Sequence, residues 1–337
     1  MIESTNLTRR NLSAMVASAS LVGLGLPVTS KAATELKFPH VGTTTSSYHQ
    51  AATKFSELVA AKTKNDVKVT VIPGGQMGDQ QDLLAGLRLG TIDFYTNDVG
   101  TMAFQDAGKD FNVLWAPYLF RDMDHFRAFL RSSTYKAMVE TYEAKSGIKV
   151  VGYFLDRSPR QLTTANTPVR TPGDMKGLKV RIPQIQTMLS SFRAWGANAT
   201  VMPWIETINA LRQKTIDAQD NGIDLITAFK LWESQKYYIE TDHVLAGIVL
   251  FTSARKWNQW SPEIRKAITE SVDDTYKALN DKFWEDERKG LKEMESNGMI
   301  IIKPDQAAFR KIAIEEMRRV DGQLWRKGLL DEIIQIK

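Results

Sequence analysis

The sequence has 337 residues, of which 43% are hydrophobic and 25% are charged, and its formal net charge is +5. These proportions lie near the average for globular proteins and exclude an intrinsically disordered chain, while the mild charge, without a block of Lys or Arg, argues against a nucleic-acid-binding surface. The chain has no cysteine, which excludes disulfides, thiolate chemistry and Cys-based metal sites.

The first 32 residues have the layout of a signal peptide. Arg9 and Arg10 precede an apolar run at 12–26, which is shorter than the about 20 residues needed to span a membrane. Residues 8–12 are similar to the twin-arginine export motif, and an ordinary secretory signal is the alternative. Because both routes leave the cytoplasm, we expect cleavage after Ala32 and a periplasmic protein that does not span the membrane.

Strands and helices alternate in the first part of the mature chain. In chain order, the hydrophobic spacing predicts strand 35–41, helix 46–63, strand 67–72, helix 79–88 and strand 92–95. Glycines follow the second strand and the second helix, where they end these elements. This order is typical of a parallel sheet covered by helices.

The same alternation restarts at 147–154. This segment is apolar enough to predict a strand buried on both faces and away from a sheet edge. We interpret 156–160 as a crossover between two lobes, because a mature chain of this length exceeds one core of about 150 residues. The remaining elements predicted by spacing are strand 178–182, helix 184–195 and two long outer helices at 264–294 and 305–326.

Catalytic motifs are missing from the sequence. No two histidines have metal-ligand spacing, and neither a nucleophile-elbow motif nor a phosphate-binding loop occurs. The glycine-rich segment 74–78 is explained by a turn, and Glu240 with Asp242 by a solvated face. We therefore expect no enzyme activity, no metal site and no cofactor.

Two arginines are the strongest candidates for binding. Arg181 lies inside an apolar strand, where a buried guanidinium is costly unless an anion meets it. Arg160 follows the apolar strand at the crossover. A structural salt bridge is the alternative for each, and a bidentate contact with a ligand carboxylate is the functional interpretation.

Several segments together resemble the substrate-binding proteins of tripartite ATP-independent periplasmic (TRAP) transporters, the dicarboxylate-receptor family. The resemblance extends over nearly all of the mature chain and is carried by segments 55–78, 89–93, 116–120, 174–181 and 196–221. It implies an α/β fold of two lobes, the class II type of periplasmic binding protein. The expected lobes are 33–156 with about 248–286, and 157–247 with about 287–337.

The resemblance also implies the site residues. Arg181 corresponds to the arginine that binds the ligand carboxylate, Arg160 to an assisting arginine, and Trp204 to an aromatic residue that stacks on the ligand. Further expected ligand-binding positions are Asn221, Asn97, Asp98, Asp79 and His40. A core position is the alternative for Trp204, and a turn or helix cap for Asn221.

The chain departs from the family pattern near these positions. Asp220 stands where a glutamate is common, Ile208 stands where a tyrosine is usual, and 214–215 replaces a glycine turn. These changes leave the arginines in place and leave the identity of the ligand open.

The resemblance implies a monomeric receptor that binds a small organic acid between its lobes and delivers it to a TRAP permease. An exported enzyme acting on an acidic substrate and a ligand-presenting receptor for a sensor kinase are the alternatives. A C4-dicarboxylate, a sugar acid, a monocarboxylate or a sulfonate could each meet the arginines. Trp204, Asn97 and Asn221 favour a hydroxylated acid.

Overall fold

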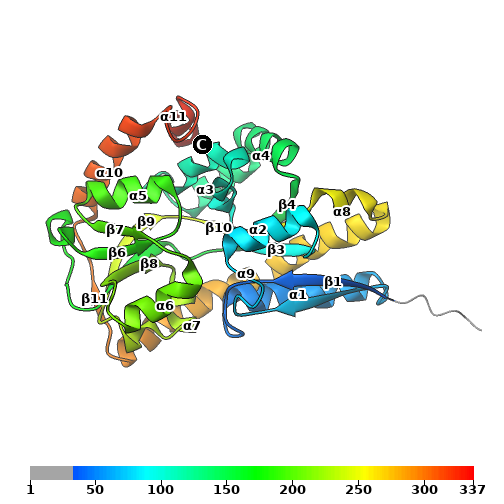
Figure 1. Cartoon of the computed structure of the whole chain (residues 1–337), viewed down its shortest axis with the longest axis horizontal. Coiled ribbons are helices and arrows are strands. Elements are labelled where there is room, and N and C mark those ends of the chain that lie inside the picture. The colour runs from blue at the N-terminus through cyan, green and yellow to red at the C-terminus, as the bar shows by residue number, and fades with distance from the viewer. Residues whose placement is uncertain (1–32) are drawn as a thin grey trace, which may run out of the picture. The chain divides into compact units, whose positions relative to one another are not determined.

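The strands of the protein form three sheets, which Figure 1 shows with the helices around them. The computed structural model describes residues 33–337, which form one compact unit. The expected signal peptide, with its arginine pair and cleavage position, lies outside the described residues.

Lobe I is built on two of the sheets. Parallel strands β1 (Thr34–Pro39) and β2 (Val67–Ile72) form the first, and antiparallel strands β3 (Phe94–Asp98), β10 (Gly247–Ser253) and β4 (Ile148–Asp156) form the second, in that order. Lobe II is built on a mixed sheet. Its strand order is β11 (Ile300–Ile302), β9 (Tyr237–Val244), β5 (Arg160–Thr164), β8 (Ala218–Asn221), β6 (Lys179–Ile182) and β7 (Asn198–Val201).

Helices pack around these sheets (Figure 1). The α-helices are α1 (Ser47–Lys62), α2 (Gln80–Leu89), α3 (Met123–Arg131), α4 (Ser133–Ser146), α5 (Gln186–Ala194), α6 (Trp204–Arg212), α7 (Ile223–Ala228), α8 (Ala254–Gln259), α9 (Pro262–Ser296), α10 (Gln306–Val320) and α11 (Leu329–Ile334). The 3₁₀ segments are η1 (Val99–Phe104), η2 (Asp106–Trp115), η3 (Pro172–Met175) and η4 (Leu231–Glu233). Within residues 33–337, no helix combines the length and apolarity of a membrane span.

Local sequence signals explain the first elements. The side chain of Ser46 caps α1 by accepting a hydrogen bond from the backbone N–H of His49, and Phe55 and Val59 bury the apolar face of this helix. Gly90 ends α2 in the left-handed conformation, with φ of 78°, which costs glycine little. The strands and helices predicted in this part of the chain are confirmed.

Three predictions about the elements were wrong. β4 lies at the edge of its sheet and is half-exposed through much of its length, because its apolar side chains pack against α9 rather than between two strands. The sheets are not all parallel, since β5 and β10 each enter a sheet directly after a crossover and run antiparallel to their neighbours. The last long helix ends at Val320, before a turn at Gly322.

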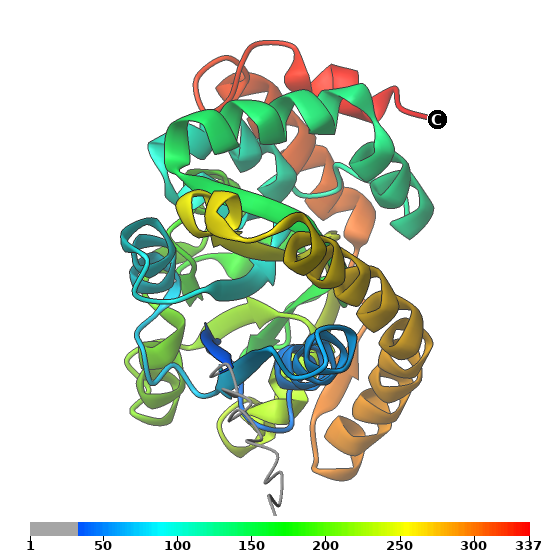
Figure 2. The ribbon, with the colours of Figure 1, turned by 90° about the vertical axis from the view of Figure 1, so that its right-hand side faces the viewer.

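Chain crossings join the two lobes. The chain passes from lobe I to lobe II between β4 and β5 and returns between β9 and β10. Helix α9 then runs beside α1, as Figure 2 shows, and contributes Ile268 and Val272 to the core of lobe I and Met294 to that of lobe II. The residue boundaries predicted for the lobes remain a proposal.

Candidate functional site

A polar cavity lies between the lobes. Its lining comes from both lobes and from the crossover between β4 and β5; it comprises Val41, Tyr48, Gln80, Asn97, Asp98, Thr101, Phe104, Trp115, Arg157, Arg160, Arg181, Pro183, Trp204, Asn221 and Leu225. Its volume of about 30 Å³ leaves room for roughly one or two water molecules. An adjoining cavity of about 200 Å³ shares Arg181 and Gln80 with it. We call the two together the interlobe cavity.

Arg181 forms no ion pair with any of the described residues. Its guanidinium lies on β6 and is 2% exposed, and its Nε–H donates to the carbonyl oxygen of Met202 at 2.9 Å. No Asp or Glu in residues 33–337 forms an ion pair with it. Burial lowers the pKa of Arg181 to about 10; the nearby charge of Arg160 acts in the same direction, and the charges of Asp220 and Asp79 oppose it without making an ion pair. The side chain remains a cation at neutral pH, and that charge is left for an anion to compensate.

Trp204 covers this guanidinium. It is the first residue of α6, and the Cζ atom of Arg181 lies 5.5 Å from the centroid of its ring. The indole N–H of Trp204 is buried and has no hydrogen-bond partner among the described residues. The site therefore presents a cation, an aromatic face and an unused donor side by side.

Arg160, in contrast, is neutralised within the protein. Its Nε lies 2.5 Å from Oδ2 of Asp220, and a nitrogen of its guanidinium lies 3.7 Å from Oδ2 of Asp98. His243 contacts the same oxygen of Asp220 at 3.1 Å. Burial alone would raise the pKa of Asp220, but Arg160 and His243 hold it well below its usual range. Asp220, noted in the sequence as a departure, is thus the partner of the second arginine.

Arg157 is a buried arginine of the cavity that the sequence did not single out. It is 2% exposed and donates hydrogen bonds to the carboxylate of Asp98 in lobe I and to the side-chain oxygen of Asn221 in lobe II. Burial opposes its charge, but Asp98 and neighbouring groups raise its pKa overall. Its only sequence signal is a basic residue directly after an apolar strand, in the segment interpreted as a crossover.

Most of the sequence-predicted residues meet at this cavity. Six of them line its inner part: Arg181, Arg160, Trp204, Asn97, Asp98 and Asn221. Asp79 lines the adjoining part and accepts a hydrogen bond from the backbone N–H of Trp204 at 3.2 Å, and burial raises the pKa of its carboxyl.

The structure does not bring His40 to the cavity. The side chain is fully buried, and its Nε2 lies 3.1 Å from Nδ1 of His49. Burial lowers its pKa to about 4, so it is neutral near pH 7. The lining residues missed from the sequence, besides Arg157, include Tyr48, Thr101, Phe104 and Trp115.

Direct hydrogen bonds join the lobes around the cavity. Gln81 of α2 donates to Gln184 at 2.9 Å, and Ser47 of α1 donates to Asp224 of α7 at 2.7 Å. With the contacts of Arg157, these bonds show lobes that are closed on each other. Within residues 33–337, no three acidic or histidine side chains are grouped to hold a metal ion.

Comparison with known proteins identifies the family. Residues 38–323 match the family described as bacterial extracellular solute-binding protein, family 7. The 2,3-diketo-L-gulonate-binding periplasmic protein YiaO of Escherichia coli is 32% identical over 83% of this chain and 84% of its own.

Solved structures agree with this match. A TRAP periplasmic solute-binding protein from Bordetella bronchispeptica, with density assigned to pantoate, has 29% identity and a TM-score of 0.84, covering 90% of this chain and 99% of its own. One from Shewanella oneidensis with bound succinate has 26% identity, a TM-score of 0.84 and the same coverage. The two-lobe α/β fold predicted from the sequence is confirmed.

Proposed function

Because the chain belongs to the family 7 bacterial extracellular solute-binding proteins, we propose that it captures a small organic acid in the interlobe cavity and delivers it to a TRAP permease. Members of this family are extracellular receptors rather than enzymes, and delivery of the solute to a permease is their role. The proposal for this chain includes a periplasmic, monomeric receptor released from its signal peptide.

The buried, unneutralised guanidinium of Arg181 carries this proposal. Arg157 and Arg160 each have a carboxylate within 4 Å, whereas Arg181 has none in the described chain. A carboxylate that meets Arg181 compensates a charge that is costly to bury, in a site where water does not screen the contact. This difference supports Arg181 as the principal anion-binding residue and Arg160 as a positioning residue held by Asp220.

Opening and closing of the lobes is part of the proposed function. The inner part of the interlobe cavity has a volume of only about 30 Å³, and Arg181 and Trp204 are almost fully buried between the closed lobes. The lobes must separate to admit a small organic acid, and hinge closure around a ligand is the usual motion of periplasmic receptors. The bonds of Gln81 to Gln184 and of Ser47 to Asp224 re-form when the lobes close.

The proposed ligand is a hydroxylated carboxylic acid, such as a sugar acid. The named ligands of the similar proteins, a diketo sugar acid, pantoate and succinate, are all carboxylates. The buried indole N–H of Trp204 and the amides of Asn97 and Asn221 can hydrogen-bond hydroxyl groups beside the carboxylate. A plain C4-dicarboxylate, a monocarboxylate and a sulfonate are the competing ligands.

Native mass spectrometry of the exported protein, purified without refolding, tests this proposal. We expect an organic acid to be released unchanged on denaturation. Calorimetry with gluconate, pantoate, succinate and taurine then compares the four ligand classes. Chemical conversion of the released acid, or equal binding of all four compounds by wild type and Arg181→Ala, would contradict the proposal.

A further inference from the structure

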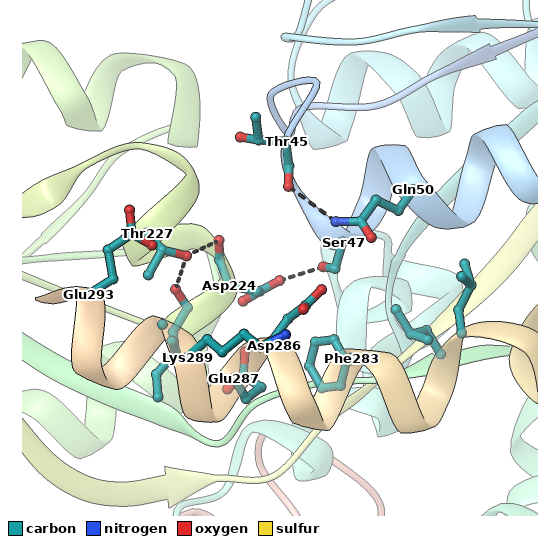
Figure 3. A pocket seen from close by; sticks show the side chains of 14 residues that line it. Thr45, Ser47, Gln50, Asp224, Thr227, Phe283, Asp286, Glu287, Lys289 and Glu293 are labelled. Carbon is teal, nitrogen blue, oxygen red and sulfur yellow. Dashed lines mark hydrogen bonds between the residues drawn. The ribbon is translucent and has the colours of Figure 1, made fainter.

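A second cavity, of about 290 Å³, lies behind the wall of the interlobe cavity. Adjacent residues form that wall: Ser47 and Asp224 line the second cavity, while the residues that follow them, Tyr48 and Leu225, line the interlobe cavity. Figure 3 shows that the second cavity lies along α9 and is bordered by α7 and the start of α1. We call it the α9 cavity.

The lining of the α9 cavity combines carboxyl groups with apolar side chains. Its carboxyl groups belong to Asp224, Asp286, Glu287 and Glu293. The apolar part of its lining is formed by Leu155, Ile223, Leu279, Phe283 and Gly290. Lys289 is the one basic residue in its described lining, and its ammonium lies 2.6 Å from Glu285. The lining therefore has an excess of negative charge.

Two of these carboxyl groups are poorly compensated. Glu287 is only 7% exposed, yet no Lys, Arg or His in residues 33–337 forms an ion pair with it. Oδ2 of Asp224 accepts the bond from Ser47, while its Oδ1 is buried without a hydrogen-bond partner in the described chain. Burial, with the charge of Asp224, raises the pKa of Glu287 to about 8. Arg157 is close enough for its charge to act on both groups, but it forms an ion pair with neither of them.

The lining of the α9 cavity suits an organic cation better than a metal ion. A metal ion such as Ca²⁺ or Mg²⁺ needs several oxygen ligands around one point, and no group of three acidic side chains in residues 33–337 meets that requirement. An alkyl chain, by contrast, covers apolar surface while its ammonium group reaches a carboxylate. Phe283 and Leu279 supply such a surface beside Glu287.

We propose that the α9 cavity binds a small organic cation, a primary amine or diamine, with its ammonium group against Glu287 and Asp224 and its carbon chain over Phe283 and Leu279. Because Ser47 belongs to lobe I and Asp224 to lobe II, the bound amine favours the closed arrangement of the lobes. That regulatory consequence rests on the proposed function, whereas binding of the amine does not.

Calorimetry and thermal unfolding of the mature protein with 1,4-diaminobutane test the site, with 1,4-butanediol as an uncharged probe of the same length. The diamine binds with a stoichiometry of one and raises the melting temperature, and the diol does neither. Binding at neutral pH releases protons, because the ammonium group favours the ionised form of Glu287. The release is measured from calorimetry in buffers of different ionisation enthalpy.

Substitutions in the lining of the α9 cavity test whether the diamine binds there. Glu287→Gln loses at least roughly tenfold in diamine affinity and abolishes the proton release, because the buried charge partner is gone. Asp224→Asn weakens binding as well, while Glu263→Gln, at the exposed start of the same helix, leaves it unchanged. Circular dichroism verifies that each variant is folded.

Three outcomes overturn this proposal: no diamine binding to the wild-type protein at millimolar concentration, equal binding of the diol, or unchanged affinity and proton release in folded Glu287→Gln. None of them bears on the organic acid, whose binding is measured at Arg181.

Discussion

The guanidinium of Arg181 lies over the indole ring of Trp204, with Cζ 5.5 Å from the ring centroid. The two residues come from β6 and α6, and neither side chain makes a hydrogen bond or an ion pair with a carboxylate in the described structure. The aromatic face partly compensates the buried cation through a cation–π interaction. A ligand carboxylate would complete that compensation, so the pair links the stability of the free protein to its ligand affinity.

Replacing Arg181 should therefore separate stability from binding. Arg181→Met removes a buried charge without a carboxylate partner, so the melting temperature of the ligand-free protein should rise. Organic acid affinity should fall by about 2 to 5 kcal/mol in calorimetry. Arg193→Met, at an exposed position on α5, is the control and should change neither quantity. Retained affinity in Arg181→Met would exclude this residue as the anion-binding group.

Replacing Trp204 should weaken acid binding in steps. Trp204→Phe keeps an aromatic face but loses the buried N–H, and the weaker cation–π contact alone should cost about 0.5 to 1 kcal/mol of affinity. Trp204→Leu loses both features and should bind more weakly still. Trp232→Phe changes a tryptophan outside the interlobe cavity and serves as the control. Equal affinities of the Phe and Leu variants in calorimetry would show that the ring does not contact the ligand.

The interlobe contact of Arg157 should stabilise the fold. Arg157→Met leaves the buried carboxylate of Asp98 without its nearest cation, and we expect the free energy of unfolding in urea to fall by about 3 to 5 kcal/mol. The ion pair of Lys136 with Glu140 is largely exposed, so Lys136→Met should cost at most about 1 kcal/mol. Similar small losses in both variants would mean that Arg157 is not structurally required.

Stability should fall with rising pH because of Glu287. Its pKa is about 8 in the folded protein and 4.5 by reference, so folding favours its protonated form, and the benefit is lost as pH rises between these values. Burial and then the charge of Asp224 raise this pKa, while Ser158 and Arg157 oppose the increase. The melting temperature of wild type, relative to Glu287→Gln, should decline over this range and level off above it. Parallel curves for the two proteins would contradict the prediction.

Removing the bond at the mouth of the cavity should speed ligand release. Gln81→Ala deletes the 2.9 Å contact with Gln184, and the loss of about 1 kcal/mol should raise the dissociation rate about fivefold with little change in association. Stopped-flow tryptophan fluorescence measures both rates. Gln323→Ala, an exposed change on the turn after α10, is the control. A slower association rate with unchanged release would show that Gln81 acts on entry instead.

Local and long-range features differed in how well the sequence predicted them. Ser46 and Gly90 mark helix ends through their own chemistry, and Arg181 stands in a motif that resembles a known family. Arg157 carries no such signal, because its partners Asp98 and Asn221 are 59 and 64 residues away in the sequence. The role of Arg157 depends on hydrogen bonds to residues of both lobes. Contacts between residues so far apart in the sequence produce no local sequence pattern.

The edge position of β4 was unpredictable for the same reason. Its neighbour in the sheet is β10. In the sequence, β10 follows β4 only after the whole segment from β5 to β9, which belongs to the other lobe. An apolar strand that packs on a helix and one that lies between two strands have the same composition. Only the partner, supplied from far along the chain, distinguishes the two.

The central position of β10 in the sheet of lobe I has a consequence for biosynthesis. During translation, β3 and β4 emerge from the ribosome long before the strand that joins them, so this sheet cannot be completed until residue 253 has been made. A fragment that stops at Asp156 contains both outer strands but lacks the strand that pairs with each of them. Lobe I is therefore not an independent folding unit, and no single cut of the chain can release it intact.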